Sequence, residues 1–340
     1  MIARLVGYYS ALTLECLGGK NTRRINAPLK RAGRRPGGNV PMDIRAQLVV
    51  SGITVGMIYA VIAFGYQLTF ATSETLNFGQ GEALMVGALV GLTTINFMIG
   101  LQIGTLWAYL LMLPVVMAFG LLQGSIIEFL GVRQAITIKS EAGWIMATIA
   151  LGIIIKNLAE NIWGRDALKF PSPLSEAALQ IGPVRIQPME IAIVIGAILL
   201  MLAVEFFNRR SIYGKAVVAT SNDRDAAGLM GINTKMVITF SYALSSMAAA
   251  FAGVLVAPVT LTGAGMGAVL GLKAFAVAII GGLSSGIGLV VGGLILGITE
   301  NLTGYYLSSG YKDVPGLVLL LLVLSLKPSG LFGKATIKKV

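Results

Sequence analysis

Long apolar runs separated by short polar segments dominate this chain from residue 47 onward. A run of about 20 mostly apolar residues has the length that an α-helix needs to cross a lipid bilayer. We therefore expect an all-α, polytopic membrane protein with about eight to nine membrane segments, including broken or re-entrant elements. The expected segments are 47–70, 83–99, 101–129, 144–163, 189–207, 236–259, a glycine-dense region at 263–293 that continues to 302, and 314–326. The third run exceeds the usual length, so we expect it to tilt or fray.

Lys and Arg residues near the ends of these segments predict how the chain is oriented, because cytoplasmic loops are enriched in them. The polar island, residues 208–235, holds five, and we place it in the cytoplasm with the 131–142 connection and the C-terminal tail. The proline-containing loop at 164–188 then lies outside, as irregular structure. This count puts the start of the first segment outside. A basic N-terminus favours the inside, so either that N-terminus is absent or a broken or re-entrant element at 73–82 changes the parity.

Composition agrees with a membrane protein and excludes several kinds of chemistry. Hydrophobic residues make up 56% of the chain and charged residues 12%, against roughly 25% charged in soluble domains. Glycine accounts for 43 of 340 residues, which predicts closely packed membrane helices. One cysteine and no histidine exclude a disulfide framework and disfavour a zinc or haem site. We expect no cofactor and no metal.

The first 41 residues differ from the rest in charge. They contain eight basic residues and one acidic residue, so they carry seven of the eleven net positive charges. A basic tail can bind nucleic acid or anionic lipid, yet this one has no regular apolar face. We interpret 1–41 as a disordered or misannotated extension, with translation starting at Met42, and expect no nucleic-acid partner. The membrane domain is then 42–333, followed by a tail at 334–340.

Motifs for an internal energy source are missing. The sequence contains no G-x-x-x-x-G-K-[ST] phosphate-binding loop, so this chain does not hydrolyse ATP. The Gly-Ala-Gly-Met-Gly run at 263–267 has no preceding strand, and helix packing or a re-entrant turn explains it better than dinucleotide binding.

Several segments resemble one known family. TLNFGQGEALM at 75–85 resembles the Asn-Phe-Ala-His-Gly-Glu signature of permease subunits of branched-chain amino-acid ABC transporters, the LivH-like group. Residues 144–174, the island sequence YGKAVVATSNDRDAAGLMGIN and the C-terminal third with YKDV and LKPSGLFG are similar to the family as well. Together they cover nearly all of 44–333 in family order. The chain departs from the family at Gly79 and Gln80, where Ala-His is common, and in its extra N-terminus.

The resemblance implies a non-catalytic permease subunit in the cytoplasmic (inner) membrane of a bacterium or archaeon. Its expected partners are two ABC ATPase subunits, a second homologous permease, an extracytoplasmic solute-binding protein and the lipid bilayer. Expected solutes are branched-chain or other hydrophobic amino acids. Related permeases import urea or short amides, which is one alternative. An ion-coupled secondary transporter and a membrane-anchored adaptor with a basic tail are alternatives of other classes, although no convincing internal repeat supports the first.

The middle of the polar island predicts a short helix from about 223 to 230. Asn222 is the expected N-cap, Asp225 favours the first turn, and Gly231 ends the helix. The resemblance implies that this is the coupling helix that contacts the ATPase, whereas an ordinary amphipathic connector is the alternative. The expected coupling residues are Asn222, Asp223, Asp225, Ala226, Ala227, Gly228, Leu229 and Gly231.

Ionisable residues inside membrane segments are costly and are therefore candidate functional groups. Glu82 lies in such a position, and unwound backbone near it can face a solute, although capping of the following helix is the alternative. Lys273 and Glu300 are expected to form a buried pair with a structural or gating role. The candidate path or gating residues are Asn77, Gly79, Gln80, Gly81, Glu82, Lys273 and Glu300. Lys156 and Glu160 are expected to neutralise each other near the outer surface. Glu128 and Glu205, near cytoplasmic ends, are expected to extend to the interface or to pair with Arg133 and Arg209.

Overall fold

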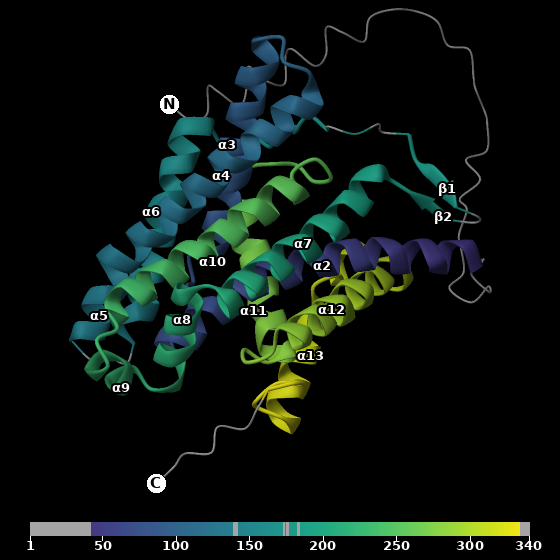
Figure 1. Cartoon of the computed structure of the whole chain (residues 1–340). Coiled ribbons are helices and arrows are strands. Elements are labelled where there is room, and N and C mark those ends of the chain that lie inside the picture. Colours follow the sequence, from purple (N-terminus) through teal and green to yellow (C-terminus); the bar gives the residue numbers. More distant parts are fainter. Residues whose placement is uncertain (1–41, 139–141, 173, 175–176, 182–183, 334–340) are drawn as a thin grey trace, which may run out of the picture. The chain divides into compact units, whose positions relative to one another are not determined.

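The structure is a computed structural model that describes residues 42–333 except 139–141, 173, 175–176 and 182–183 (Figure 1). The expected N-terminal extension at 1–41 and the tail at 334–340 lie outside the described residues. All described residues belong to one unit of the chain, 40–340.

Apolar helices make up almost all of this unit. Eight helical segments of the described chain are long and apolar enough to cross a membrane, which confirms an all-α polytopic membrane protein. The long helices are α2 (Met42–Ser73), α3 (Gln80–Gly100), α4 (Thr105–Ile127), α6 (Gly143–Trp163), α7 (Pro188–Arg210), α10 (Thr234–Val256), α12 (Gly286–Tyr306) and α13 (Val314–Leu326). α13 has spanning length only together with the turn before it, as Ser309–Leu326, and α11 (Met266–Gly281), with 16 residues, stays below that length. Residues 282–285 separate α11 from α12 within the glycine-dense region.

The third apolar run is longer than predicted. After α4 the chain continues through a π-helical turn, Glu128–Val132, into α5 (Arg133–Thr137). Our prediction of a polar connection beginning at residue 131 was therefore wrong for 131–137. The helix continues because the charged residues are held inside the bundle: Arg133 Nη2 donates to Glu128 Oε2 at 2.9 Å, and Thr239 Oγ1 of α10 donates to the same oxygen at 2.7 Å.

The loop at 164–188, which we expect outside, is less irregular than predicted. It contains a short antiparallel hairpin, β1 (Leu179–Ile181) and β2 (Val184–Ile186), with Gln180 opposite Arg185. The Arg185 amide donates to Gln47 Oε1 of α2 at 2.9 Å, which fastens the hairpin to the start of that helix. α7 begins after this hairpin and ends next to the short helices of the polar island, so hairpin and island lie at opposite ends of α7 (Figure 1).

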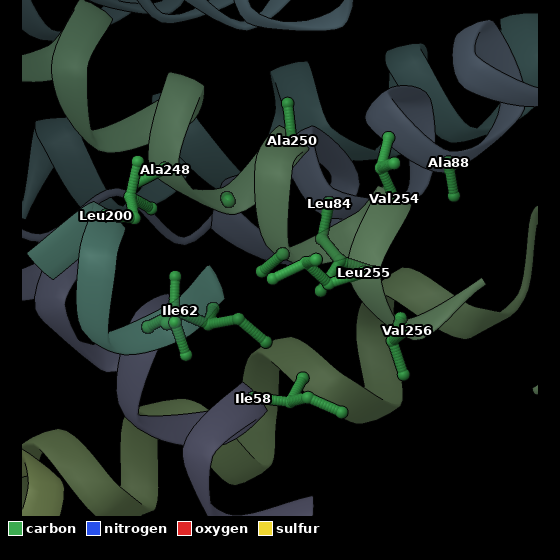
Figure 2. Packing of buried hydrophobic residues seen from close by; sticks show 14 of the residues in the cluster. Ile58, Ile62, Leu84, Ala88, Leu200, Ala248, Ala250, Val254, Leu255 and Val256 are labelled. Atoms are coloured by element: carbon green, nitrogen blue, oxygen red, sulfur yellow. The ribbon is translucent and has the colours of Figure 1, made fainter. Parts of the chain in front are cut away.

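Two helices, α2 and α10, form the centre of the packing. α2 contacts α7, α10, α11 and α12, while α10 also contacts α3 and α4. Buried side chains of α2 and α10 form one cluster with side chains of the helices around them (Figure 2). It includes Ile58 and Ile62 of α2, Leu84 and Ala88 of α3, Leu200 of α7, and Ala248, Val254 and Leu255 of α10. The predicted close packing through glycine is present: a Cβ on Gly56 would overlap the Gly293 backbone, and one on Gly87 would overlap Ala250.

The helical structure is interrupted between α2 and α3, at residues 74–79. α3 does not begin beside the end of α2. Its first residue, Gln80, packs against Gly65, which lies eight residues before the end of α2, or about 12 Å along the helix axis. The first turn of α11 meets the first turn of α3 at the same place, with the Gly267 and Gly81 backbones in contact. Two helices therefore begin in the interior of the bundle.

Candidate functional site

Asn77 and Gln80 fasten the start of α3 to α10. Gln80 is fully buried; its Nε2 donates to the Ser245 carbonyl at 2.9 Å, and its Oε1 lies 2.9 Å from Ser245 Oγ. Asn77, also fully buried, accepts the Gly79 amide at 3.0 Å. Both amides of the predicted path thus satisfy hydrogen bonds within the packed bundle, and neither lines the cavity that lies one turn further on.

Glu82 occupies a different environment. Its half-buried side chain lines a cavity of about 180 Å³ between α2, α3, α6 and α11. On α6 the carboxylate faces Gly152, where an added Cβ would lie 3.4 Å from Glu82 Oε2. Of the predicted path residues, Gly81 and Glu82 line this cavity. The other lining residues are Tyr66, Phe78, Ile149, Gly152, Ile153, Gly267, Ala268, Gly271, Leu272 and Phe275.

Aromatic rings form one wall of the cavity, and the sequence analysis did not identify them. The Phe78 ring lies 5.4 Å from that of Phe275 and stacks on Trp144 at 6.2 Å. Phe275 meets Tyr66 edge to face at 5.9 Å, and the Tyr66 hydroxyl donates to the Gly271 carbonyl at 3.3 Å. Each ring is held by a neighbour, so the wall is preorganised. The only sequence signal was the position of Phe78 within the 75–85 motif.

Lys273 and Glu300 form the buried pair that was expected, away from this cavity. Lys273 Nζ lies 3.1 Å from Glu300 Oε2 and 2.7 Å from Asp313 Oδ1. The Tyr59 hydroxyl donates to Glu300 Oε2 at 2.9 Å, and Glu300 is 1% exposed. The pair joins α11, α12 and α2 to the start of α13, where its role in gating stays a prediction.

The three other expected ion pairs are also present. Glu128 pairs with Arg133 at 2.9 Å, Glu205 with Arg209 at 2.7 Å, and Lys156 with Glu160 at 3.9 Å.

The polar island folds into two helices, of which one was predicted. The unexpected helix is α8 (Ile212–Asn222), capped by Ser211, whose Oγ accepts the Gly214 amide at 2.9 Å. The predicted helix is α9 (Arg224–Leu229), and its cap is Asp223, whose Oδ1 accepts the Ala226 amide at 2.9 Å. Our assignment of Asn222 as the cap was wrong, because that residue is the last of α8. Gly231, with φ of +85°, ends this segment as predicted.

α9 presents apolar side chains to its surroundings. Leu229 is 90% exposed and Met230 is 84% exposed, whereas Ala227 is buried. Behind α9, residues 220–224 and the end of α2, 71–74, line a common pocket of about 210 Å³. α8 contacts both α2 and α9, so the exposed apolar pair is joined through α8 to the helix that precedes the α2–α3 break.

Comparison with known proteins places this architecture in a family. Residues 48–325 match the family model described as branched-chain amino acid transport system / permease component. The chain belongs to this family of permeases. The high-affinity branched-chain amino acid transport system permease protein LivH of Escherichia coli K12 is 32% identical over 318 residues, covering 86% of this chain and 97% of that protein. BraD of Pseudomonas aeruginosa, described as a permease protein of the same kind of system, is 30% identical over 304 residues, with the same coverage.

An archaeal relative and one solved structure also match the permease. The probable branched-chain amino acid transport permease protein LivH of Methanocaldococcus jannaschii is 27% identical over 307 residues, covering 86% of this chain and 94% of that protein. The solved structure is PsaBC from Streptococcus pneumoniae in complex with Fab, with a TM-score of 0.43 and 15% identity over 84% of this chain and 92% of that chain. A likeness at that level carries no argument about this permease.

Proposed function

We propose that this permease imports branched-chain or other hydrophobic amino acids across the cytoplasmic membrane, as the non-catalytic membrane subunit of an ABC importer. The match to the family model over residues 48–325 carries the proposal. The curated relatives are named as permease proteins of high-affinity branched-chain amino acid transport systems.

The proposed complex contains a second homologous permease, two ATPase subunits and an extracytoplasmic binding protein that delivers the solute. The sequence has no phosphate-binding loop, so in this proposal other chains hydrolyse the ATP that drives uphill transport. The polar island faces the cytoplasm in this arrangement, and the β1–β2 hairpin at the opposite end of α7 faces outside.

In this proposal α9 couples ATP hydrolysis to transport. Two large apolar side chains exposed at the tip of a polar segment offer the kind of anchor that fills a pocket on a partner protein. Closure of the ATPases would displace α9, and the contact between 220–224 and 71–74 would pass this displacement to the end of α2.

The coupling role is tested with the double variant Leu229→Glu, Met230→Glu in the reconstituted complex. Two charges at an apolar contact are expected to abolish solute-stimulated ATPase activity and to weaken co-purification of the ATPase subunits. Leu307→Glu is the matched control, because Leu307 is an exposed apolar residue (70%) that is not part of the polar island. It follows the end of α12, whereas Gly282, which contacts Ser329 and Gly333 near the C-terminus, precedes the start of that helix. Unchanged stimulation in the double variant would reject the coupling role of α9.

Transport itself is tested in proteoliposomes that contain the complete complex and internal ATP. Leucine uptake that requires ATP and the binding protein is the expected result. Uptake of urea or acetamide in place of leucine would favour the alternative solutes. Uptake by the purified permease alone, driven by an ion gradient, would favour a secondary transporter.

A further inference from the structure

One face of α6 carries polar side chains along the part of the helix that crosses the membrane. The polar stripe of α6 consists of Lys156, Asn157, Glu160 and Asn161. Asn157 and Asn161 are exposed, and each donates to the carbonyl four residues earlier on its own helix, at 2.8 and 2.9 Å. Asn157 lies six residues before the end of α6, which is about 9 Å along the helix axis. The whole helix is about as long as the hydrocarbon core of a bilayer is thick. Lys156 can extend its ammonium toward the interface, but the short Asn157 side chain cannot.

α6 also exposes the apolar side chains of Ile153, Ile154, Leu158 and Ile162, so the polar stripe is one part of its exposed surface. Two other helices expose no polar side chain in their middle. Every strongly exposed side chain in the middle of α7 and of α13 is apolar, as lipid contact requires. These residues are Ile195, Ile198, Leu199, Leu202, Leu317, Val318, Leu321 and Leu322. Polar side chains inside a membrane face water-filled space or another protein chain. The polar stripe of α6, unlike the apolar part of its exposed surface, therefore borders the aqueous path or the subunit interface that surrounds it.

The polar stripe leads to the Glu82 cavity. Gly152, which faces the Glu82 carboxylate, lies one helical turn before Lys156 on the same face of α6. The cavity combines one carboxylate with three aromatic rings and the aliphatic side chains of Ile149, Ile153 and Leu272. No residue in the described part of the chain forms a salt bridge with Glu82. Lys156, which lies 3.9 Å from Glu160, is near enough to attract the Glu82 carboxylate without pairing with it.

We infer that the Glu82 cavity is a solute subsite that binds the ammonium group of an amino acid in transit. The carboxylate would accept the ammonium, the rings of Tyr66, Phe78 and Phe275 favour a cation near their faces, and the aliphatic wall takes an apolar side chain. This inference rests on the proposed function and adds to it the chemical group that the membrane path recognises. A neutral solute such as urea could donate hydrogen bonds to this carboxylate but would lack the attraction between opposite charges.

The first test measures the field of Glu82 from inside the cavity. Cys16 is the only cysteine of the chain, so Cys16→Ser with Gly152→Cys places a single thiol beside the carboxylate, in a complex whose other subunits lack cysteine. The probes are two methanethiosulfonate reagents of similar size. One carries a cationic 2-(trimethylammonium)ethyl group and the other an anionic 2-sulfonatoethyl group. The ratio of the two labelling rates cancels any change in the reactivity of the thiol itself. Because the attacking thiolate is itself an anion, the ratio is divided by the ratio that a small thiol gives in solution. We expect this normalised ratio to be at least about tenfold, and to fall toward one when Glu82→Gln is added. A ratio that does not depend on Glu82, or a thiol that reacts with neither probe, would overturn the inference.

The second test is transport by the complete complex. Glu82→Gln is expected to lower leucine import per ATP hydrolysed by about tenfold or more, since a hydrogen bond between charged groups is lost. Glu82→Asp keeps the charge and is expected to restore most of the import, which a purely structural role of the glutamate side chain would not predict. Glu205→Gln is the matched control, because Glu205 forms an exposed pair with Arg209 away from the cavity.

The two proposals fail in distinguishable ways. If the wild-type complex imports no leucine, the proposed function is wrong. If the wild type imports leucine and Glu82→Gln imports it equally well per ATP, the proposed function stands and the ammonium subsite is rejected.

Discussion

Breaking the Lys273–Glu300 pair should destabilise the permease far more than breaking an exposed pair. In Lys273→Met, Glu300 stays 1% exposed and keeps the Tyr59 hydroxyl as a donor, but loses the cation 3.1 Å away. An uncompensated buried charge costs about 3–5 kcal/mol. Asp313 loses the same cation, but its side chain is 69% exposed and regains water. We therefore expect the loss to come almost entirely from Glu300.

A second substitution separates the charge from the packing. In Lys273→Met with Glu300→Gln the buried charge is gone, and the neutral amide still accepts the Tyr59 hydroxyl. Replacing a buried pair by neutral groups of similar volume is often close to neutral. The double variant should therefore recover at least about half of the stability that the single variant loses.

The measurement is the free energy of unfolding in mixed detergent micelles at neutral pH, followed by tryptophan fluorescence. Arg209→Met is the control, since Arg209 and Glu205 are 78% and 47% exposed and such pairs contribute at most about 1 kcal/mol. The reasoning is refuted if Lys273→Met lowers stability no more than this control does. Leucine import by the stable double variant then separates structure from gating, because a gating role predicts loss of import without loss of stability.

Three further outcomes are expected. Gly87→Ala forces its new Cβ into the Ala250 backbone and should lower stability in detergent by about 1–3 kcal/mol. Gly104→Ala is the control, because a Cβ there has nothing within 4 Å and should not lower stability. Size-exclusion chromatography of heated samples compares the two variants. Asp223→Ala removes the cap of α9, which should destabilise that helix by about 0.5–2 kcal/mol and weaken solute-stimulated ATPase activity. An equal loss of activity in Asn222→Ala would contradict the assignment of Asp223 as the cap. Removing residues 1–41 should leave leucine import nearly unchanged, and abolished import would favour the adaptor with a basic tail.

Local patterns in the sequence determined the class of the protein, its membrane segments and the position of the short helix α9. These features depend on the apolar length of a segment or on short-range capping, and both can be counted along the chain. The end of α9 at Gly231 follows from a residue that adopts positive φ without strain. The choice between Asn222 and Asp223 as its cap did not follow, because both residues can cap a helix and only the presence of α8 decided between them.

Only the tertiary structure distinguished the roles of Asn77, Gln80 and Glu82. All three are polar residues near one break, and the sequence suggested the same path role for each. In the folded bundle the two amides reach α10 and are satisfied there, whereas the carboxylate faces a glycine on α6 and leaves a cavity open. The side of a helix that receives a neighbour depends on contacts between residues far apart in the chain. Gly152 and Phe275 therefore became part of the site only when α6 and α11 were placed against α3.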